Sequence, residues 1–145
     1  MKSILSETGN KVIDILLSLT HSYCIPVLLY ATESMSLTIT EKRRLASPFQ
    51  RLYFKMFTSF DPQTIAYCQF YTGYLPMDYM IDLRFLKFLT KTANTTNVFL
   101  NLLFSLNGNA SINNVCAKYQ ANKKVISSVK NAMWNFFIHE NKLNI

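Results

Sequence analysis

The residues that most often bind metal ions are thinly spread along this chain. His21 and Cys24 are three positions apart, a spacing that places both on one face of a helix. Cys68, Cys116 and His139 are the remaining cysteine and histidine residues that could complete a metal site. No C-x-x-C pair or other paired ligand spacing occurs, and buried thiols or a surface imidazole explain the same residues. We therefore predict no metal site and no cofactor.

The sequence also lacks any local signature of catalysis. Its 8 acidic residues are scattered, with no D-D or D-x-D pair to hold two magnesium ions for phosphoryl or nucleotidyl transfer. It contains neither a Gly-rich phosphate loop nor a G-x-S-x-G sequence. A Ser-His-Asp or Cys-His set assembled from distant positions stays open. We predict no catalytic residues and no enzymatic activity of the chain on its own.

Basic residues recur at helical spacing and alternate with aromatic ones, as in RRLASPFQRLYFK and RFLKFLTK. The chain has 15 Lys and Arg against 8 Asp and Glu, a net charge of +7, which favours an anionic partner. We predict the following phosphate contacts: Arg44, Arg51, Lys55, Arg84, Lys87 and Lys91. Tyr53 and Phe54 lie among them and are candidate stacking partners. Ordinary solvated faces of amphipathic helices are the alternative reading of the same pattern.

Composition predicts the elements that must position these residues. Half of the 145 residues are hydrophobic, and 3 glycines and 4 prolines leave few breaks. This favours long helices over short strands with tight turns. We expect one all-α domain over residues 1–145, a small multi-helix bundle with Pro-kinked helices.

The most apolar stretch, Val12 to Ala31, is long enough to cross a membrane. It contains Asp14, several hydroxyl residues and Pro26, so a buried core helix is favoured and no membrane contact is expected. The N-terminal residues lack an uninterrupted apolar region, and the 3 cysteines have no pairing pattern. We expect an intracellular protein, nuclear or cytoplasmic.

The first half of the chain predicts two helical zones. The first runs from Ser3 or Asn10 to Ala31 and kinks or restarts at Pro26, which lacks an amide hydrogen. The second opens at Thr38, which forms a capping box with Glu41. Ser47-Pro48 inside this second zone predicts either a kink or a restart of the helix. Arg44 would leave the helix face that it shares with Arg51 and Lys55 only if the helix restarts at a large angle.

The second half predicts shorter elements. Asp61-Pro62 opens a short helix that ends at Gly73, and Pro76 opens the helix MDYMIDLRFLKFLTK. The apolar run VFLNLLFSL is expected to end at Asn107-Gly108, followed by a flexible loop over residues 109–114. A last helix is expected from about Asn122 to His139.

The segment SYCIPVLLYATESMSLTITEKRRLASPFQRLYFKMF resembles the region just after the palm in reverse transcriptases of LINE-type (non-LTR) retrotransposons. The resemblance rests on Ile25, Pro26, Leu28, Leu29, Tyr30, Glu33, Arg44, Leu45, Arg51, Lys55 and Phe57. GYLPMDYMIDLRFLKFL is similar to the family's next segment, through Leu75, Pro76, Asp82, Leu83 and Arg84. Ala31 stands where glycine is common in the family, and Pro48 interrupts a helix that usually continues.

The resemblance covers residues 10–92 and implies a helical thumb, with residues 93–145 as a C-terminal extension. In that family the thumb closes on an RNA–DNA hybrid without reading its sequence. The catalytic Y/F-A-D-D box, the endonuclease domain and the C-terminal Cys/His cluster are not in this sequence. The resemblance therefore implies a non-catalytic piece of an RNA-directed DNA polymerase that binds hybrid or duplex backbone. The alternative is an interaction module whose exposed apolar helix faces bind the rest of a polymerase or a second copy.

Overall fold

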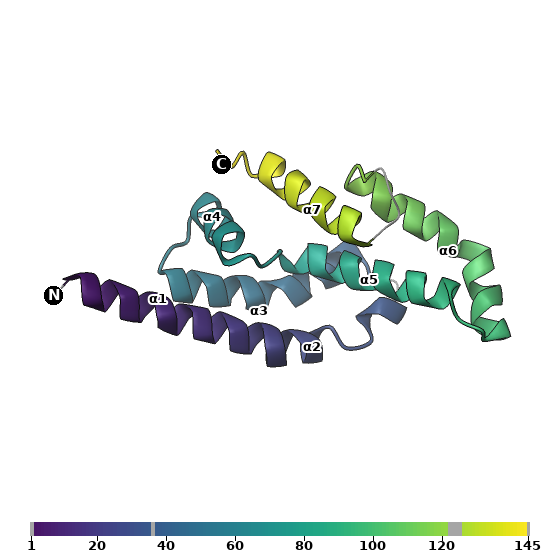
Figure 1. Cartoon of the computed structure of the whole chain (residues 1–145), viewed down its shortest axis with the longest axis horizontal. Helices are drawn as coiled ribbons and strands as arrows, with labels where there is room; N and C mark the ends of the chain where they lie inside the picture. Colours follow the sequence, from purple (N-terminus) through teal and green to yellow (C-terminus); the bar gives the residue numbers. More distant parts are fainter. Residues whose placement is uncertain (1, 36, 122–125, 145) are drawn as a thin grey trace.

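The computed structural model describes residues 2–35, 37–121 and 126–144. These residues are mostly helical and contain no strand, which confirms the predicted all-α fold (Figure 1). The elements are α1 (Lys2–Leu19), the π turn η1 (Thr20–Cys24), α2 (Ile25–Leu28), the 3₁₀ turn η2 (Thr32–Ser34), α3 (Ile39–Phe57), α4 (Pro62–Thr72), α5 (Met77–Ala93), α6 (Val98–Lys118) and α7 (Ile126–Glu140).

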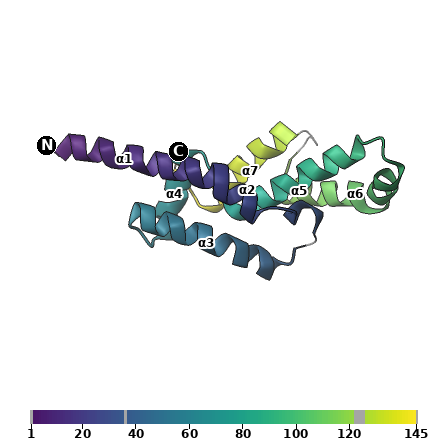
Figure 2. The same cartoon turned by 90° about the horizontal axis from the view of Figure 1, so that it is seen from below.

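α1, η1 and α2 form one long rod, whose N-terminal end extends beyond the other helices (Figure 2). Pro26 cannot donate a hydrogen bond, and its ring crowds the preceding turn of a regular helix. The wider π turn just before it absorbs this conflict, with the Ile25 amide donating to the Thr20 carbonyl. Ala31 then ends the rod at φ 60°, a left-handed conformation that glycine adopts more easily.

α3 begins as its sequence predicts and continues through Pro48. The Glu41 amide donates to Thr38 Oγ1 at 3.3 Å, and the Thr38 amide donates to Glu41 Oε2 at 2.8 Å. These bonds confirm the capping box. Pro48 lies inside the helix with its ring exposed, and α3 does not restart there. Arg44 therefore stays on the same helix as Arg51.

α4 and α5 also begin and end close to the predicted residues. Asp61 caps α4 by accepting a hydrogen bond from the Thr64 amide at 2.8 Å. Gly73 ends α4 at φ 74°, as its residue type predicts. Pro76 then precedes the first residue of α5.

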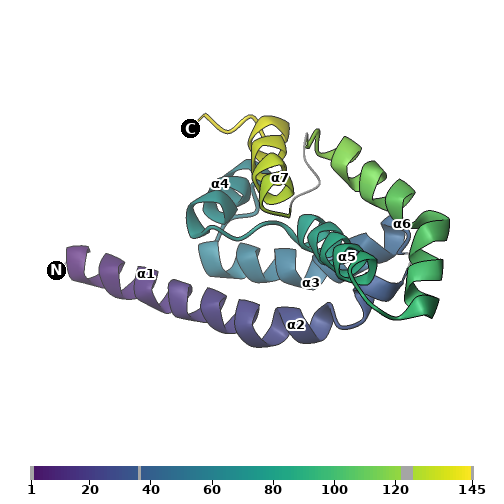
Figure 3. The same ribbon diagram turned by 45° about the vertical axis from the view of Figure 1, so that its right-hand side comes forward.

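The predicted end of a helix at Asn107-Gly108 is wrong, and residues 109–114 do not form a loop. α6 continues to Lys118 and changes direction along its length (Figure 3). Gly108 is buried, and a Cβ atom there would overlap the ring of Phe104. Packing of this ring, one turn earlier in the helix, outweighs the low helix propensity of glycine. The predicted start of the last helix at Asn122 lies outside the described residues.

α5 lies between two clusters of buried side chains. The first joins the rod to α3, α4 and the start of α5: Leu17, Ile25, Leu29, Phe49, Tyr53, Ile65, Met77 and Ile81. The second joins α4 and α5 to α6 and α7, and includes Tyr79, Leu83, Leu86, Tyr119, Met133 and Phe137. α5 thus supplies buried residues on opposite sides, and only a narrow edge of it reaches solvent.

Candidate nucleic-acid interface

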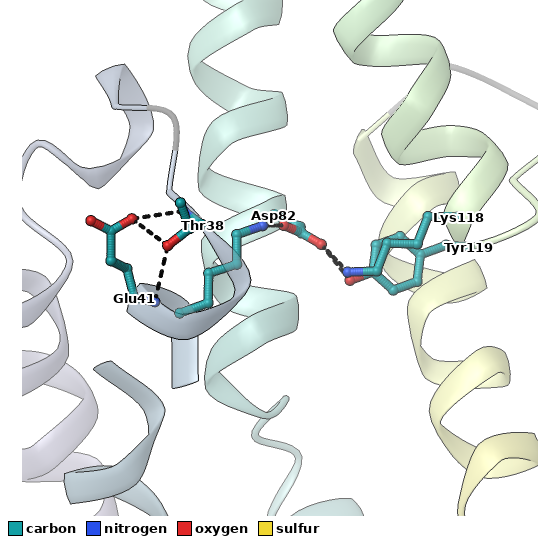
Figure 4. A network of polar contacts seen from close by, with 6 residues as sticks. Thr38, Glu41, Asp82, Lys118 and Tyr119 are labelled. Atoms are coloured by element: carbon teal, nitrogen blue, oxygen red, sulfur yellow. Dashed lines mark hydrogen bonds and ion pairs between the residues drawn. The ribbon is translucent and has the colours of Figure 1, made fainter. Parts of the chain in front are cut away.

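A buried carboxylate at the middle of the fold binds two of the chain's lysines. Asp82 on α5 accepts hydrogen bonds from Lys42 Nζ at 2.7 Å, Lys118 Nζ at 2.6 Å and the Tyr119 hydroxyl at 2.7 Å (Figure 4). We call these four residues the Asp82 cluster. Burial alone would raise the pKa of Asp82, but the two ammonium groups and the hydroxyl outweigh it and lower the pKa. The cluster therefore joins α3, α5 and α6 through one ionised carboxylate.

The Asp82 cluster removes Lys42 and Lys118 from the set of free cations. Their ammonium groups form ion pairs with a carboxylate whose side chain is only 7% exposed. The partners are separated from Asp82 by 40 and 36 residues in sequence. No local pattern reveals such a contact, and our sequence analysis did not identify these residues as structural.

Three of the predicted phosphate contacts lie together on α3. Arg44, Arg51 and Lys55 are all exposed, and we call them the α3 basic face. At about 100° per residue they lie on the side of the helix away from the buried Phe49 and Tyr53. Within the described ranges none of the three forms an ion pair. This face therefore presents positive charge to solvent, partly offset at Arg44 by the exposed Glu41.

The other three predicted contacts, Arg84, Lys87 and Lys91, lie along the solvent edge of α5, and we call them the α5 basic edge. They surround a shallow hollow whose lining also includes Phe88 and Glu33. Lys87 and Lys91 are exposed, and Phe88 is half-buried. The hollow combines positive charge with part of an aromatic ring. Our sequence analysis did not single out Phe88, although it lies directly between Lys87 and Lys91 in the same helix.

Arg84 differs from these lysines because it also contacts the end of the rod. Its Nη1 lies 3.9 Å from Glu33 Oε2 and donates a long, 3.4 Å hydrogen bond to the Leu29 carbonyl. The guanidinium is half-exposed and is shared between the hollow and η2. We infer that Arg84 positions η2 against α5 as well as adding charge.

The two basic sets do not form one continuous patch. α3 and α5 run in opposite directions. Lys42, near the start of α3, contacts Asp82, whereas residues later in α3 line a cavity with Met77 and Tyr79, which precede Asp82 on α5. Lys55 and Lys91 therefore lie toward opposite ends of the helix pair. At about 1.5 Å per residue, their separation along the helix axes is on the order of 30 Å. A ligand that contacts both sets has to be elongated.

The prediction that Tyr53 stacks on a ligand is wrong. Tyr53 is 0% exposed, and its ring packs between Phe49 and Phe57 in the first cluster. Burial raises the pKa of its hydroxyl to about 12. Tyr53 lies four residues after the buried Phe49, so both side chains are on the inward-facing side of α3. Phe54 is half-buried, with its ring 5.8 Å from that of the exposed Phe60.

The cysteines and histidines do not come together. His21 stacks on Tyr74 with ring centroids 3.6 Å apart, and burial lowers its pKa to about 4. Cys24 is exposed, whereas Cys116 is buried in the second cluster. Among residues 2–35, 37–121 and 126–144, no group of three potential metal ligands is found. His21 is thus part of an aromatic packing contact.

In comparisons with protein families, curated proteins and solved structures, the chain matches none of them significantly.

Proposed function

We propose that this chain is a non-catalytic module that binds the phosphate backbone of an RNA–DNA hybrid or duplex without reading its sequence. The observation that supports this most is the separation of its cations into two groups. Lys42 and Lys118 are bound to Asp82, whereas the α3 basic face and the two lysines of the α5 basic edge are exposed and lack ion-pair partners in the described part of the chain. Exposed cations on rigid helices suit phosphate contact.

The acidic residues near these cations offset only part of the positive charge. Glu41 and Asp61 accept hydrogen bonds at helix N-termini, which lowers the pKa of both carboxyls. Asp82 is buried between two lysines. Glu41 and Asp61 keep their negative charge, and Glu41 partly offsets Arg44, but the excess of 15 Lys and Arg over 8 Asp and Glu leaves a net positive charge.

The resemblance of residues 10–92 to the thumb of LINE-type reverse transcriptases suggests where such a module originates. We propose descent from the C-terminal part of an RNA-directed DNA polymerase. In this proposal the chain holds the hybrid and a separate palm would supply the catalytic aspartates. Four basic residues are shared between the resemblance and the two basic sets: Arg44, Arg51, Lys55 and Arg84.

A salt titration with labelled RNA–DNA hybrids tests the binding proposal. Two hybrids of unrelated sequence should bind equally, because phosphates are the same in both. Binding should weaken steeply with salt, with a slope of log K against log salt of about −0.9 for each phosphate contacted. A protein that fails to bind at low salt, or that binds with no salt dependence, would contradict the proposal.

The structure also offers support for a second function, an interaction module. Large apolar side chains are exposed on several elements, among them Val27, Phe60, Tyr71, Val98 and Leu106. Exposed apolar patches of several hundred Å² mark interaction surfaces in soluble proteins. Sedimentation of the purified chain separates this function from nucleic-acid binding alone, which requires no self-association or protein partner.

A further inference from the structure

The rod formed by α1, η1 and α2 is apolar on two opposite sides. Leu17, Ile25 and Leu29 face inward and are at most 5% exposed. The opposite side holds seven large apolar residues between 45% and 83% exposed, which we call the α1 apolar stripe: Val12, Ile15, Leu16, Leu19, Tyr23, Val27 and Tyr30. A helix buried on one side ordinarily places polar residues on the other. This rod therefore has a second apolar face to cover.

The spacing within the stripe is that of a helix that packs along another helix. Val12, Leu16, Leu19 and Tyr23 are separated by four, three and four residues, the alternation of a coiled-coil seam. The next interval, to Val27, is four residues where the seam requires three. η1 lies at this point, and a π turn accommodates one extra residue. The π turn thus keeps Val27 in line with the residues before it.

We propose that the α1 apolar stripe binds the same stripe of a second copy, in an antiparallel pair of rods. In a two-fold pair centred at His21, Val12 faces Tyr30, Leu19 faces Tyr23 and Ile15 faces Val27. Each pair then joins a larger side chain to a smaller one, which fills the seam evenly. A parallel pair would place Tyr23 against Tyr23 and Val12 against Val12, leaving the seam alternately crowded and empty.

The charge on the rod is compatible with self-association and does not suit nucleic acid. The stripe contains no charged residue, and the flanking Lys11 and Asp14 cancel one another. The α3 basic face and α5 basic edge lie on other helices, and salt screens charges over about 8 Å at physiological ionic strength. Lys11 is the one cation beside the stripe in the part of the rod whose side chains are described, and Asp14 offsets its charge, so this side offers phosphate groups no net positive charge.

The size of the stripe predicts a weak dimer. Side chains of this type remove roughly 60–120 Å² each from water when they are fully buried. Allowing for their partial exposure, the stripe contributes roughly 250–500 Å² per copy, or about 500–1,000 Å² in total. That is below the roughly 1,200 Å² at which stable specific interfaces begin. We expect dissociation within the micromolar concentration range.

Sedimentation velocity over a wide concentration range tests the pairing. Leu19→Lys places a charge in the seam and should convert the dimer to a monomer. Ser18→Lys is the matched control, because Ser18 is exposed on the same helix outside the stripe, and it should leave the dimer intact. Circular dichroism of both variants checks that the helices persist. A wild-type protein that stays monomeric, or a dimer that survives Leu19→Lys, would overturn the proposal.

Oxidative cross-linking tests the orientation. In a Cys24→Ser background, which removes the exposed native thiol, Val12→Cys should cross-link to Tyr30→Cys when the two proteins are mixed. In the antiparallel pair, two copies of position 12 lie roughly 27 Å apart, too far for a disulfide. Cross-linking of each variant only with itself would show that the rods are parallel, contrary to the proposal.

A lipid surface is the competing occupant of the stripe. Residues Lys11–Leu28 have a mean hydropathy of 1.3 and only 11% of them are buried, so by length and composition they could cross a membrane. Flotation with phosphatidylcholine vesicles, with and without phosphatidylserine, addresses this. The proposed dimer should stay in solution with both. Flotation that Leu19→Lys abolishes, from a protein that is monomeric without vesicles, would assign the stripe to lipid instead.

Discussion

Two regions of α5 use lysines in opposite ways. In the Asp82 cluster, Lys42 and Lys118 come from other helices and their ammonium groups contact a buried carboxylate. Along the α5 basic edge, Lys87 and Lys91 belong to α5 itself and are exposed beside Phe88. A net charge of +7 does not distinguish these roles. The comparison shows that the position of the acid partner decides whether a lysine stabilises the fold or stays free for a ligand.

Removing the shared carboxylate should have the largest effect on stability. Asp82→Ala leaves two ammonium groups and a hydroxyl around an apolar methyl group. Loss of one partner from a fully buried ion pair costs about 3–5 kcal/mol. The Lys42 and Lys118 side chains are 28% and 50% exposed and can be rehydrated, so we expect the free energy of unfolding to fall by about 2 kcal/mol. Urea unfolding followed by circular dichroism measures this.

A matched substitution on the α5 basic edge sharpens the comparison. Lys87→Ala changes a lysine on the same helix whose ammonium has no ion-pair partner among the described residues, and stability should change by less than about 0.5 kcal/mol. A similar loss of stability in Lys87→Ala and Asp82→Ala would show that the two regions do not differ as we describe.

The α3 basic face should contribute to binding independently of the α5 basic edge. We expect Arg51→Gln with Lys55→Gln to weaken binding to a long hybrid about tenfold at low salt, through the loss of two phosphate contacts. The loss of binding free energy in this α3 double variant should add to the loss caused by Lys87→Gln with Lys91→Gln on α5, because the two sites are far apart. Fluorescence anisotropy measures both losses. An affinity unchanged by the α3 substitutions would restrict the interface to α5.

His21 should make stability depend on pH. Burial against Tyr74 lowers its pKa to about 4 in the folded protein, whereas an exposed histidine has a pKa of about 6.5. The unfolded chain therefore binds the proton more readily, so the stabilising contribution is complete above about pH 6.5 and is lost as the pH falls toward 4. Urea unfolding at several pH values should show this, and His21→Gln should reduce the dependence over that window. A wild-type pH profile matched by His21→Gln would contradict the contribution of His21.

The smallest effect is expected at Tyr53. Its hydroxyl is buried and has no hydrogen-bond partner among the residues that the structure describes. Tyr53→Phe should therefore leave stability unchanged or raise it by less than about 1 kcal/mol, since no bond is lost. Nucleic-acid affinity should not change, because the ring does not reach solvent. A loss of affinity without a loss of stability would restore Tyr53 as a ligand contact.

Local signals in the sequence predicted much of this fold. The Thr38–Glu41 capping box, the Asp61-Pro62 start and the Gly73 end each depend on residues within one turn of one another. The exposed positions of Arg44 and Lys87 likewise follow from helical spacing. Such features require no knowledge of distant contacts.

The features that the sequence did not predict depend on tertiary packing. Gly108 indicates a helix end when only the neighbouring sequence is considered, and the packing of the Phe104 ring beside it is evident only in the structure. Tyr53 is an exception, because it lies one turn after the buried Phe49 and its helical position alone indicates an inward-facing ring. The ion pairs of the Asp82 cluster join residues 36 and 40 positions apart. No local pattern therefore indicates these pairs, or that Lys42 and Lys118 are bound within the fold. The α1 apolar stripe likewise could be identified only from the structure, which shows that the opposite side of the rod is buried.

The most direct test of the account measures how salt weakens binding when two lysines are removed. Lys87→Gln with Lys91→Gln should make the slope of log K against log salt less steep by about 1.8, the value for two phosphate contacts. Lys11→Gln with Lys130→Gln removes the same charge from exposed positions on α1 and α7 and should leave the slope unchanged. Equal changes in the two double variants would mean that only net charge matters, and would contradict a binding surface on α5.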